Sequence, residues 1–162
     1  MGKIEKHRWI KQRDSFSCVT VAILNLLKWA GVSVTYESGF DYWKQKANQT
    51  HDGSHIRDYS AIFSQIPNIK FTRKTRPTLE EIDEVLFNGN TVLLRSAWDE
   101  NGDIHRHILL ITGRTEKSLF LTNTFRGHAW FAKWLVKAWY MEEHQLRSGI
   151  YPTAWFFKKK LS

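Results

Sequence analysis

Cysteine is the scarcest reactive residue in this sequence, because the 162-residue chain contains only Cys18. A single cysteine excludes an internal disulfide framework, so the reducing cytoplasm is the expected location. Long apolar runs are also lacking, since stretches such as Ile108–Ile111 are far shorter than the roughly 20 residues that span a bilayer. The charged start, residues 1–6, is not followed by an apolar stretch of signal-peptide length. We therefore expect a soluble, cytoplasmic protein that does not insert into membranes.

Breaks between domains are lacking as well. The chain has three prolines and nine glycines, and no repeat or low-complexity linker interrupts it. Its length and its 42% apolar content suit one core that buries roughly two thirds of the unfolded surface. We therefore expect residues 1–162 to form a single domain.

Positive charge is in excess, with 24 Lys and Arg against 16 Asp and Glu and a net charge of +8. Such a charge favours nucleic acids, anionic membranes or acidic proteins as partners. The cations fall into loose clusters in residues 3–13, 70–76 and 158–160, and no zinc, RNA-recognition or helix-turn-helix signature accompanies them. The pattern is more typical of a solvated basic surface than of a nucleic-acid site. It does not indicate an oligomeric state.

Hydrophobic periodicity predicts helices first and strands afterwards. The apolar run after Ser17 predicts a buried helix that ends at Gly31. Thr78 and Glu81 form a capping box for a helix that closes at Gly89. The other expected elements are a helix with Ile56, Tyr59, Ile62, Phe63 and Ile66 on one face, strands at 69–72, 91–95, 106–112, 118–122 and 153–157, and a helix or irregular segment with Trp130, Phe131, Trp134, Leu135 and Ala138 on one face. Residues 32–46 are left open. This order is typical of an α+β fold in which N-terminal helices pack on a C-terminal antiparallel sheet.

Four residues together supply the parts of a thiol-dependent site for amide cleavage. Cys18 falls in the first turn of the predicted buried helix, where the helix dipole favours the thiolate. Gln12 can donate to an oxyanion, His107 can hold the thiolate and move protons, and Asn123 can orient the imidazole. His107 and Asn123 flank a hairpin centred near residues 115 and 116, which predicts that they lie directly opposite each other unless the register slips.

The spacing from Gln12 to Cys18, followed by an apolar helix, resembles the papain-like cysteine peptidases and most closely the bacteriocin-processing, double-glycine leader peptidases. The matching stretches cover most of the chain and are Cys18 to Gly31, Gly53-Ser54, Thr78 to Leu94, His107 to Gly113 and Leu119 to Asn123. The resemblance implies a papain-like fold, hydrolysis of a peptide or isopeptide amide in a peptide or protein substrate, and an oxyanion hole built from Gln12 and the Cys18 N–H. We expect no cofactor and no metal. The chain departs from the family pattern with Val19-Thr20 in place of Gly-Pro and Asn123-Thr124 in place of Asp-Pro.

Other interpretations of these residues stay open. His105 and His107 share one face of the predicted strand, so they could bind zinc together with Cys18, His51 or His55. His105 is the rival to His107 as the base, and only the family pattern selects His107. His107 could instead be a satisfied core histidine, and Trp98 or Trp130 could shield a catalytic site from solvent. The thiolate could also pass an acyl group to an amine rather than to water. A noncatalytic peptidase-like module could bind a peptide, an acidic partner or nucleic acid.

Overall fold

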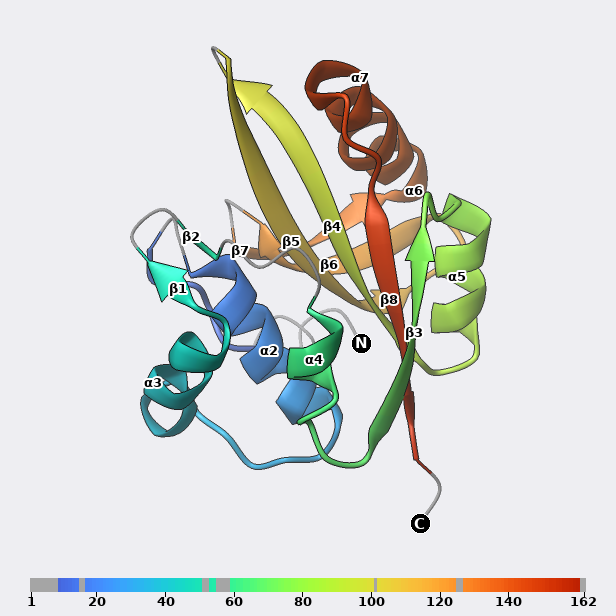
Figure 1. The fold of residues 1–162 in the computed structure, drawn as a ribbon. Helices are drawn as coiled ribbons and strands as arrows, with labels where there is room; N and C mark the ends of the chain where they lie inside the picture. Colours follow the sequence, from blue (N-terminus) through green and yellow to red (C-terminus); the bar gives the residue numbers. More distant parts are fainter. Residues whose placement is uncertain are drawn as a thin grey trace.

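The computed structural model describes residues 9–14, 17–50, 53–54, 59–100, 102–124 and 127–160, with helices first along the chain and a large sheet after them (Figure 1). The first part contains the helices α2 (Cys18–Trp29), α3 (Tyr36–Lys46) and α4 (Ser60–Phe63) and the short strands β1 (Gln49–Thr50) and β2 (Gly53–Ser54). Every residue of α2 except Lys28 is buried. Gly31, with a φ of +88°, follows the end of α2 in the left-handed region that glycine adopts without strain. The predicted central helix is confirmed.

Six antiparallel strands form the main sheet in the order β3-β8-β4-β5-β6-β7. They are β3 (Ile69–Thr75), β4 (Thr91–Glu100), β5 (Asp103–Arg114), β6 (Ser118–Thr124), β7 (Gly127–Ala132) and β8 (Thr153–Lys159). Helix α5 (Leu79–Phe87) connects β3 to β4. A continuous helical stretch connects β7 to β8 and consists of α6 (Lys133–Leu135), the π-helix η1 (Val136–Glu143) and α7 (His144–Ser148). The predicted α+β fold with an antiparallel sheet is confirmed.

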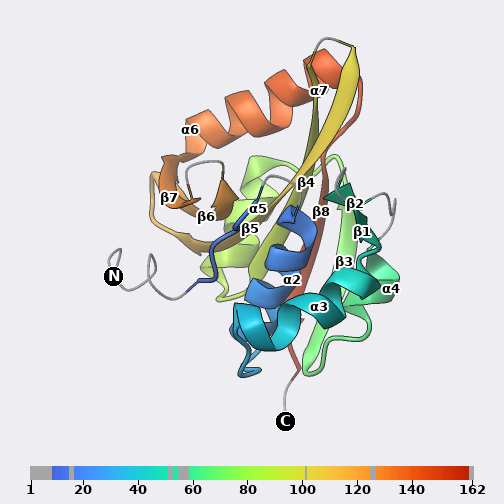
Figure 2. The ribbon, with the colours of Figure 1, turned by 90° about the vertical axis from the view of Figure 1, so that its left-hand side faces the viewer.

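Helices cover both faces of this sheet, with α2 on one face and α5 and the α6–α7 stretch on the other (Figures 1 and 2). Side chains of a strand alternate between the two faces, and β5 shows this clearly. Ile108 and Leu110 belong to the hydrophobic cluster that contains Cys18, which we call the α2 core. Leu109 and Ile111 belong to the cluster that contains residues of α5 and η1, which we call the α5 core. Each side chain of this kind contributes about 1.5–3 kcal/mol when it is fully buried, so β5 stabilises both layers at once.

The local signals around two helices give different outcomes. The capping box of α5 is confirmed, because Thr78 Oγ1 accepts from the Glu81 N–H at 3.1 Å and Glu81 Oε1 accepts from the Thr78 N–H at 3.0 Å. The helix expected around residues 56–66 is shorter, since α4 spans only Ser60–Phe63 and Ile56 lies outside the described residues. The segment left open at 32–46 contains α3, which has its own capping box at Thr35.

The aromatic residues after residue 129 do not share one helical face. Trp130 pairs with Phe120 and Phe131 pairs with Leu119 in the β6–β7 ladder. Neighbouring residues of a strand point to opposite faces, so Trp130 packs against the α2 core and Phe131 against the α5 core. The helical prediction was wrong for these two residues because strand pairing, which depends on distant parts of the chain, outweighed their local spacing.

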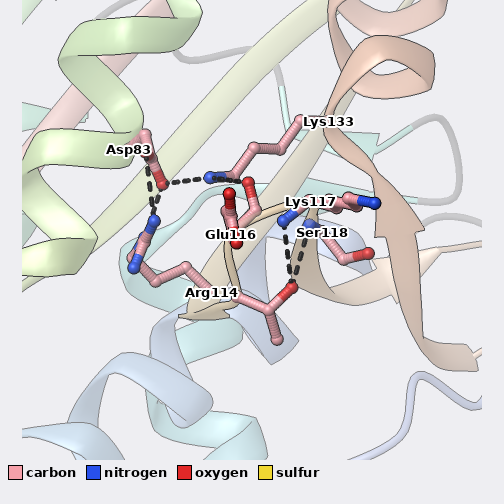
Figure 3. Close-up of polar contacts among 7 residues, drawn as sticks. Asp83, Arg114, Glu116, Lys117, Ser118 and Lys133 are labelled. Carbon is pink, nitrogen blue, oxygen red and sulfur yellow. Dashed lines mark hydrogen bonds and ion pairs between the residues drawn. The ribbon is translucent and has the colours of Figure 1, made fainter.

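One carboxylate ties the hairpin after β5 to the two helices on that side of the sheet (Figure 3). Asp83 Oδ1 lies 2.6 Å from Arg114 Nε and 2.9 Å from Lys133 Nζ. Lys133 Nζ also donates to the Glu116 carbonyl at 2.8 Å. Partial burial opposes ionisation of Asp83, but the hydrogen bonds and charges of Arg114 and Lys133 outweigh it and hold the pKa of Asp83 below its ordinary value.

We predict that Asp83→Asn lowers the free energy of unfolding by about 1–2 kcal/mol at pH 7, because it removes a charge-assisted acceptor that is partly screened by solvent. A depressed pKa stabilises the fold above the ordinary value of 3.8, and this contribution is lost as the pH falls through the folded-state pKa. Urea denaturation at pH 7 and pH 2.5 should therefore show a difference between the two proteins that shrinks in acid. Glu84→Gln on the exposed side of α5 is the control. A constant difference at both pH values would contradict the assignment.

Candidate active site

Cys18 is the first residue of α2 and is buried, with 8% of its surface exposed. Its thiol lies against β5, where the backbone of Ile108 hydrogen-bonds to it. Burial raises the pKa of Cys18 to about 11, although the backbone hydrogen bonds from Ile108, Val19 and Cys18 itself act in the opposite direction. The helix terminus alone predicts a favoured thiolate, but desolvation outweighs it here. The thiol is therefore protonated at neutral pH in this conformation.

Gln12 lies on the segment Trp9–Asp14, which runs along α2. Its side-chain amide donates to the Asp14 carbonyl at 2.6 Å, so it is engaged within its own segment. The carboxylate of Asp14 in turn accepts from the Ser17 N–H at 2.8 Å, directly before Cys18. Gln12 also lines an open groove of about 620 Å³ between this segment and the start of α3. The structure thus places Gln12 on a segment that is fixed to the N-terminus of α2.

The other end of this segment is held by two buried side chains. Asn25 of α2 accepts from the Ile10 N–H at 2.7 Å and donates to the Ile10 carbonyl at 3.1 Å. His128 of β7 has its Nε2 at 3.2 Å from the Trp9 carbonyl, and burial lowers its pKa. Neither residue is marked by a local sequence pattern, because both act on backbone that is distant in the sequence. Together they fix the backbone of residues 9 and 10 and so the position from which the Gln12 side chain extends.

We predict that Asn25→Leu releases this segment while leaving the sheet intact. The change keeps the branched shape and the number of heavy atoms of a fully buried side chain but leaves both polar groups of Ile10 without their partner, which should cost about 2–3 kcal/mol. Hydrogen exchange at the Ile10 amide should speed up by at least about tenfold, as measured by NMR, while the Leu110 amide at the centre of the sheet keeps its protection after correction for global stability. Unchanged exchange at Ile10 would contradict the anchoring role.

His107 lies in the middle of β5 and is 5% exposed. It pairs in register with Ser96 of β4, whose hydroxyl lies 3.1 Å from Nδ1 of His144 in α7. Because Ile108 faces the α2 core and side chains alternate along β5, His107 leaves the strand on the face of Ser96 and His144. Cys18 contacts the adjacent residue Ile108 on the opposite face of the sheet, the face covered by α2. Sequence reasoning missed Ser96 and His144, which only the β4–β5 register and the packing of α7 bring to His107.

In the part of the chain that the structure describes, the pairing between β5 and β6 ends before His107 is reached. Within the described residues, β6 pairs with β5 only from Leu110 onward toward Arg114. The part of β5 that contains His107 therefore lies beyond this ladder. The contact between Cys18 and His107 stays a prediction.

Asn123 lies on β6, and its predicted pairing is shifted. Leu110 pairs with Thr122 and Ile111 with Leu121, so the next step of this ladder puts Asn123 beside Leu109 rather than opposite His107. The direct opposition was wrong by two residues, because the turn closes between Thr115 and Ser118, and the bulge between Ile111 and Gly113 moves the register back by only one residue. The side chain of Asn123 lies outside the described residues, so its orienting role stays a prediction.

Most residues of the alternative interpretations, the zinc site and the shielding tryptophans, have side chains outside the described part of the chain. No group of three or more His, Cys, Asp or Glu side chains that could hold a metal ion occurs in the described residues. His51 and His55, and the side chains of His105 and Trp98, lie outside those residues. Trp130 packs edge-on against Phe120, with 5.2 Å between the ring centres. The zinc site and the shielding role therefore stay predictions.

His144 is the most strongly perturbed histidine among the described residues. Burial, followed by the charge of Arg147, lowers the pKa of His144 to about 4, although Glu143 acts in the opposite direction. The rings of Trp139 and Tyr140 enclose it, with centres 5.1 Å and 5.3 Å away. The imidazole is therefore neutral when it contacts Ser96.

This burial predicts a loss of stability in acid. The unfolded chain binds a proton at His144 near its ordinary pKa of 6.5, whereas the folded chain does so only near 4. Stability from this group therefore falls as the pH drops from 6.5 to 4, by up to about 3 kcal/mol. Urea denaturation of His144→Gln, whose amide can still contact Ser96, should show a shallower dependence on pH over this interval than the wild type. Equal slopes would contradict the prediction.

Solved structures of other proteins superpose on this chain. No family model and no curated protein matches this sequence. The peptidase domain of Streptococcus ComA, a bifunctional ABC transporter involved in quorum sensing, superposes with a TM-score of 0.61 at 11% identity, over 95% of this chain and 99% of that one. A Bacillus anthracis protein described as a C39-like peptidase superposes with a TM-score of 0.58 at 12% identity, over 95% of each chain.

These likenesses confirm the resemblance to bacteriocin-processing peptidases at the level of the fold. Identity of 11–12% does not extend to individual site residues. A search of the described helices for one that could cross a membrane finds none. The chain has the papain-like α+β fold of C39 peptidase domains.

Proposed function

We propose that this chain is a cysteine peptidase-like hydrolase that cleaves a peptide or isopeptide amide with Cys18 as its nucleophile. The observation that carries the proposal is the place of the thiol. Cys18 begins the central buried helix of a peptidase fold and touches the backbone of Ile108, the residue directly after His107. The fixed segment that bears Gln12 lies beside the same helix end.

In the proposed reaction, His107 accepts the thiol proton and the Cys18 sulfur attacks the amide carbon. The Gln12 amide and the Cys18 N–H donate to the oxyanion that forms. The C–N bond then breaks as the His107 imidazolium protonates the leaving amine, which leaves a thioester. Water, deprotonated by His107, attacks this thioester, and the acid and the thiol are released. Asn123 accepts from the imidazole and orients it.

The raised pKa of Cys18 belongs to the conformation described above, so the proposal requires a reactive conformation that the free protein also populates. A thiol with a pKa of about 11 is a poor nucleophile at neutral pH, so the reactive state requires His107 to approach the sulfur and stabilise the thiolate as an ion pair. The Gln12 amide must likewise exchange the Asp14 carbonyl for the oxyanion. Gln12 also lines the groove between its segment and α3, and this groove is where we expect the peptide to lie.

A second candidate function is a noncatalytic peptidase-like module that binds a peptide. It is favoured by the same pKa and by the alternation of β5, which directs His107 and the approach of Cys18 to opposite faces. If the amine of an acceptor replaced water in the last step, the thioester would instead give acyl transfer. These alternatives predict different behaviour of the only thiol in the chain.

We predict that iodoacetamide alkylates native Cys18 rapidly at pH 6–7, well below the free thiol pKa of about 8.5, and that His107→Ala slows this reaction by at least about tenfold. Glu84→Gln, on the exposed side of α5 and on the other face of the sheet from α2, is the control and should leave the rate within about twofold. Mass spectrometry follows the reaction. Slow alkylation that rises only toward pH 11, as burial predicts, and that ignores His107→Ala would sink the peptidase proposal and favour the binding module.

Cleavage itself can be measured without a known substrate. A proteome-derived peptide library, incubated with the wild type and with Cys18→Ala, should show new N-termini only with the wild type. Added hydroxylamine should trap part of the acyl groups as hydroxamates, since a thioester reacts with it. Identical libraries after both incubations would contradict hydrolysis.

A further inference from the structure

Cations gather along one edge of the sheet, away from the proposed peptidase site. β3 is the outermost strand and pairs with β8, three positions from β5 in the strand order (Figure 1). Seven exposed cationic residues lie on these two strands or directly after them, and they are Lys70, Arg73, Lys74, Arg76, Lys158, Lys159 and Lys160. This set, which we call the basic edge, carries much of the excess charge of the chain.

The charges of the basic edge are poorly compensated from within the fold. Lys70 lies directly opposite Lys158 in the β3–β8 ladder, an arrangement in which like charges repel. Lys74 makes an ion pair with Glu81 at 3.4 Å, but Lys70, Lys158 and Lys160 make none within the described part of the chain. Lysines on an edge strand keep it from pairing with another copy, but Lys158 lies on β8, an inner strand of the sheet, so edge protection does not account for it.

The aromatic rings beside the basic edge are already covered by cations. The Arg76 guanidinium lies 3.5 Å from the centre of the Tyr151 ring. Lys159 lies 5.0 Å from the Trp29 ring, and Arg73 lies 5.7 Å from the Trp155 ring. Proteins that bind single-stranded nucleic acids combine basic grooves with open aromatic faces on which bases stack. The basic edge offers the charge without the open faces.

The backbone of β3 offers a different means of binding. β3 pairs with β8 from residue 69 to residue 75 on one side, and no strand pairs with its other side among the described residues. An extended peptide can add to such an edge through main-chain hydrogen bonds, with its alternate side chains on each face. Lys70 and Lys74 share one face of β3, because residues two apart recur on the same side. Acidic residues at alternate positions of an added strand would meet them.

We propose that the basic edge binds an acidic, extended peptide segment that adds to β3 as a further strand. The main-chain edge supplies the hydrogen bonds, and Lys70, Lys158 and Lys74 supply the selectivity for carboxylates. The surface is a docking site for part of a partner or substrate protein rather than part of the cleavage chemistry. Its binding does not require Cys18 to be reactive, so it stands or falls separately from the proposed function.

The test uses a fluorescein-labelled peptide of about nine residues, the length of a long strand, with alternating Glu and Val. Its binding to the full-length Cys18→Ala chain is measured by fluorescence anisotropy at about 50 mM salt, where charge attraction is weakly screened. Lys70→Glu should weaken binding by at least about tenfold. The same change creates an opposite-charge pair with Lys158, so the melting temperature should stay equal or rise. Lost binding could then not be attributed to unfolding.

Further probes separate strand addition from simple charge attraction. Lys117→Glu, at an exposed lysine of the β5–β6 turn, should change the affinity less than about twofold. A peptide with Gln in place of Glu, and one with N-methyl groups on alternate residues, should both bind at least about tenfold more weakly. Equal binding of the N-methylated peptide, or tighter binding of an oligothymidine whose affinity Lys70→Glu reduces, would overturn the proposal. So would the absence of any measurable binding of the acidic peptide.

Discussion

The packing of α2 against the inner face of β5 is the contact on which the rest of the structure depends. α2 is apolar on nearly all sides, so it has to be covered by the sheet on one side and by α3, α4 and the Trp9–Asp14 segment on the others. The same packing brings the first residue of α2 to the backbone of Ile108. The site is therefore a product of the core, since the residue that would do the chemistry is also a core residue.

That double role creates a conflict between stability and reactivity. Burial that holds the N-terminus of α2 in place also removes water from the thiol and raises its pKa to about 11. A nucleophile needs the opposite, so a peptidase built on this arrangement has to supply a counter-charge at the moment of reaction. His107 is adjacent along β5 but leaves it on the other face, as does its cross-strand neighbour Ser96. A catalytic arrangement therefore requires the imidazole to lie elsewhere than in this conformation.

Charge is distributed differently on the two ends of the sheet. On the side of the β5–β6 hairpin, Asp83 forms ion pairs with Arg114 and Lys133 and ties three elements together. On the side of β3, Lys70 and Lys158 face each other, only Lys74 of the basic edge forms an ion pair among the described residues, and three cations lie within 6 Å of aromatic ring centres. The ion pairs of Asp83 lie within the fold and stabilise it. The cations of the basic edge are exposed and suit a partner that brings its own carboxylates.

The sequence by itself determined the elements whose signals are local. The apolar run after Ser17, its end at Gly31 and the capping box at Thr78 depend on neighbours within a few positions, so composition and spacing were enough to predict them. The order of these elements, together with the family resemblance, was also enough for the α+β papain-like fold. Gln12 and Cys18 are near each other in the sequence, and Asp14 and Ser17 keep them near each other in space.

Only the tertiary structure decided which residues meet across the sheet. The turn between Thr115 and Ser118 sets a β5–β6 register in which Asn123 does not lie opposite His107, and strand pairing turns Trp130 and Phe131 to opposite faces. Ser96, His128 and His144 gain their contacts from chain segments 48 or more residues away. The helix position that marked Cys18 as reactive could not reveal its burial, because the pKa of a thiol depends on all the atoms around it and not on its neighbours in the chain.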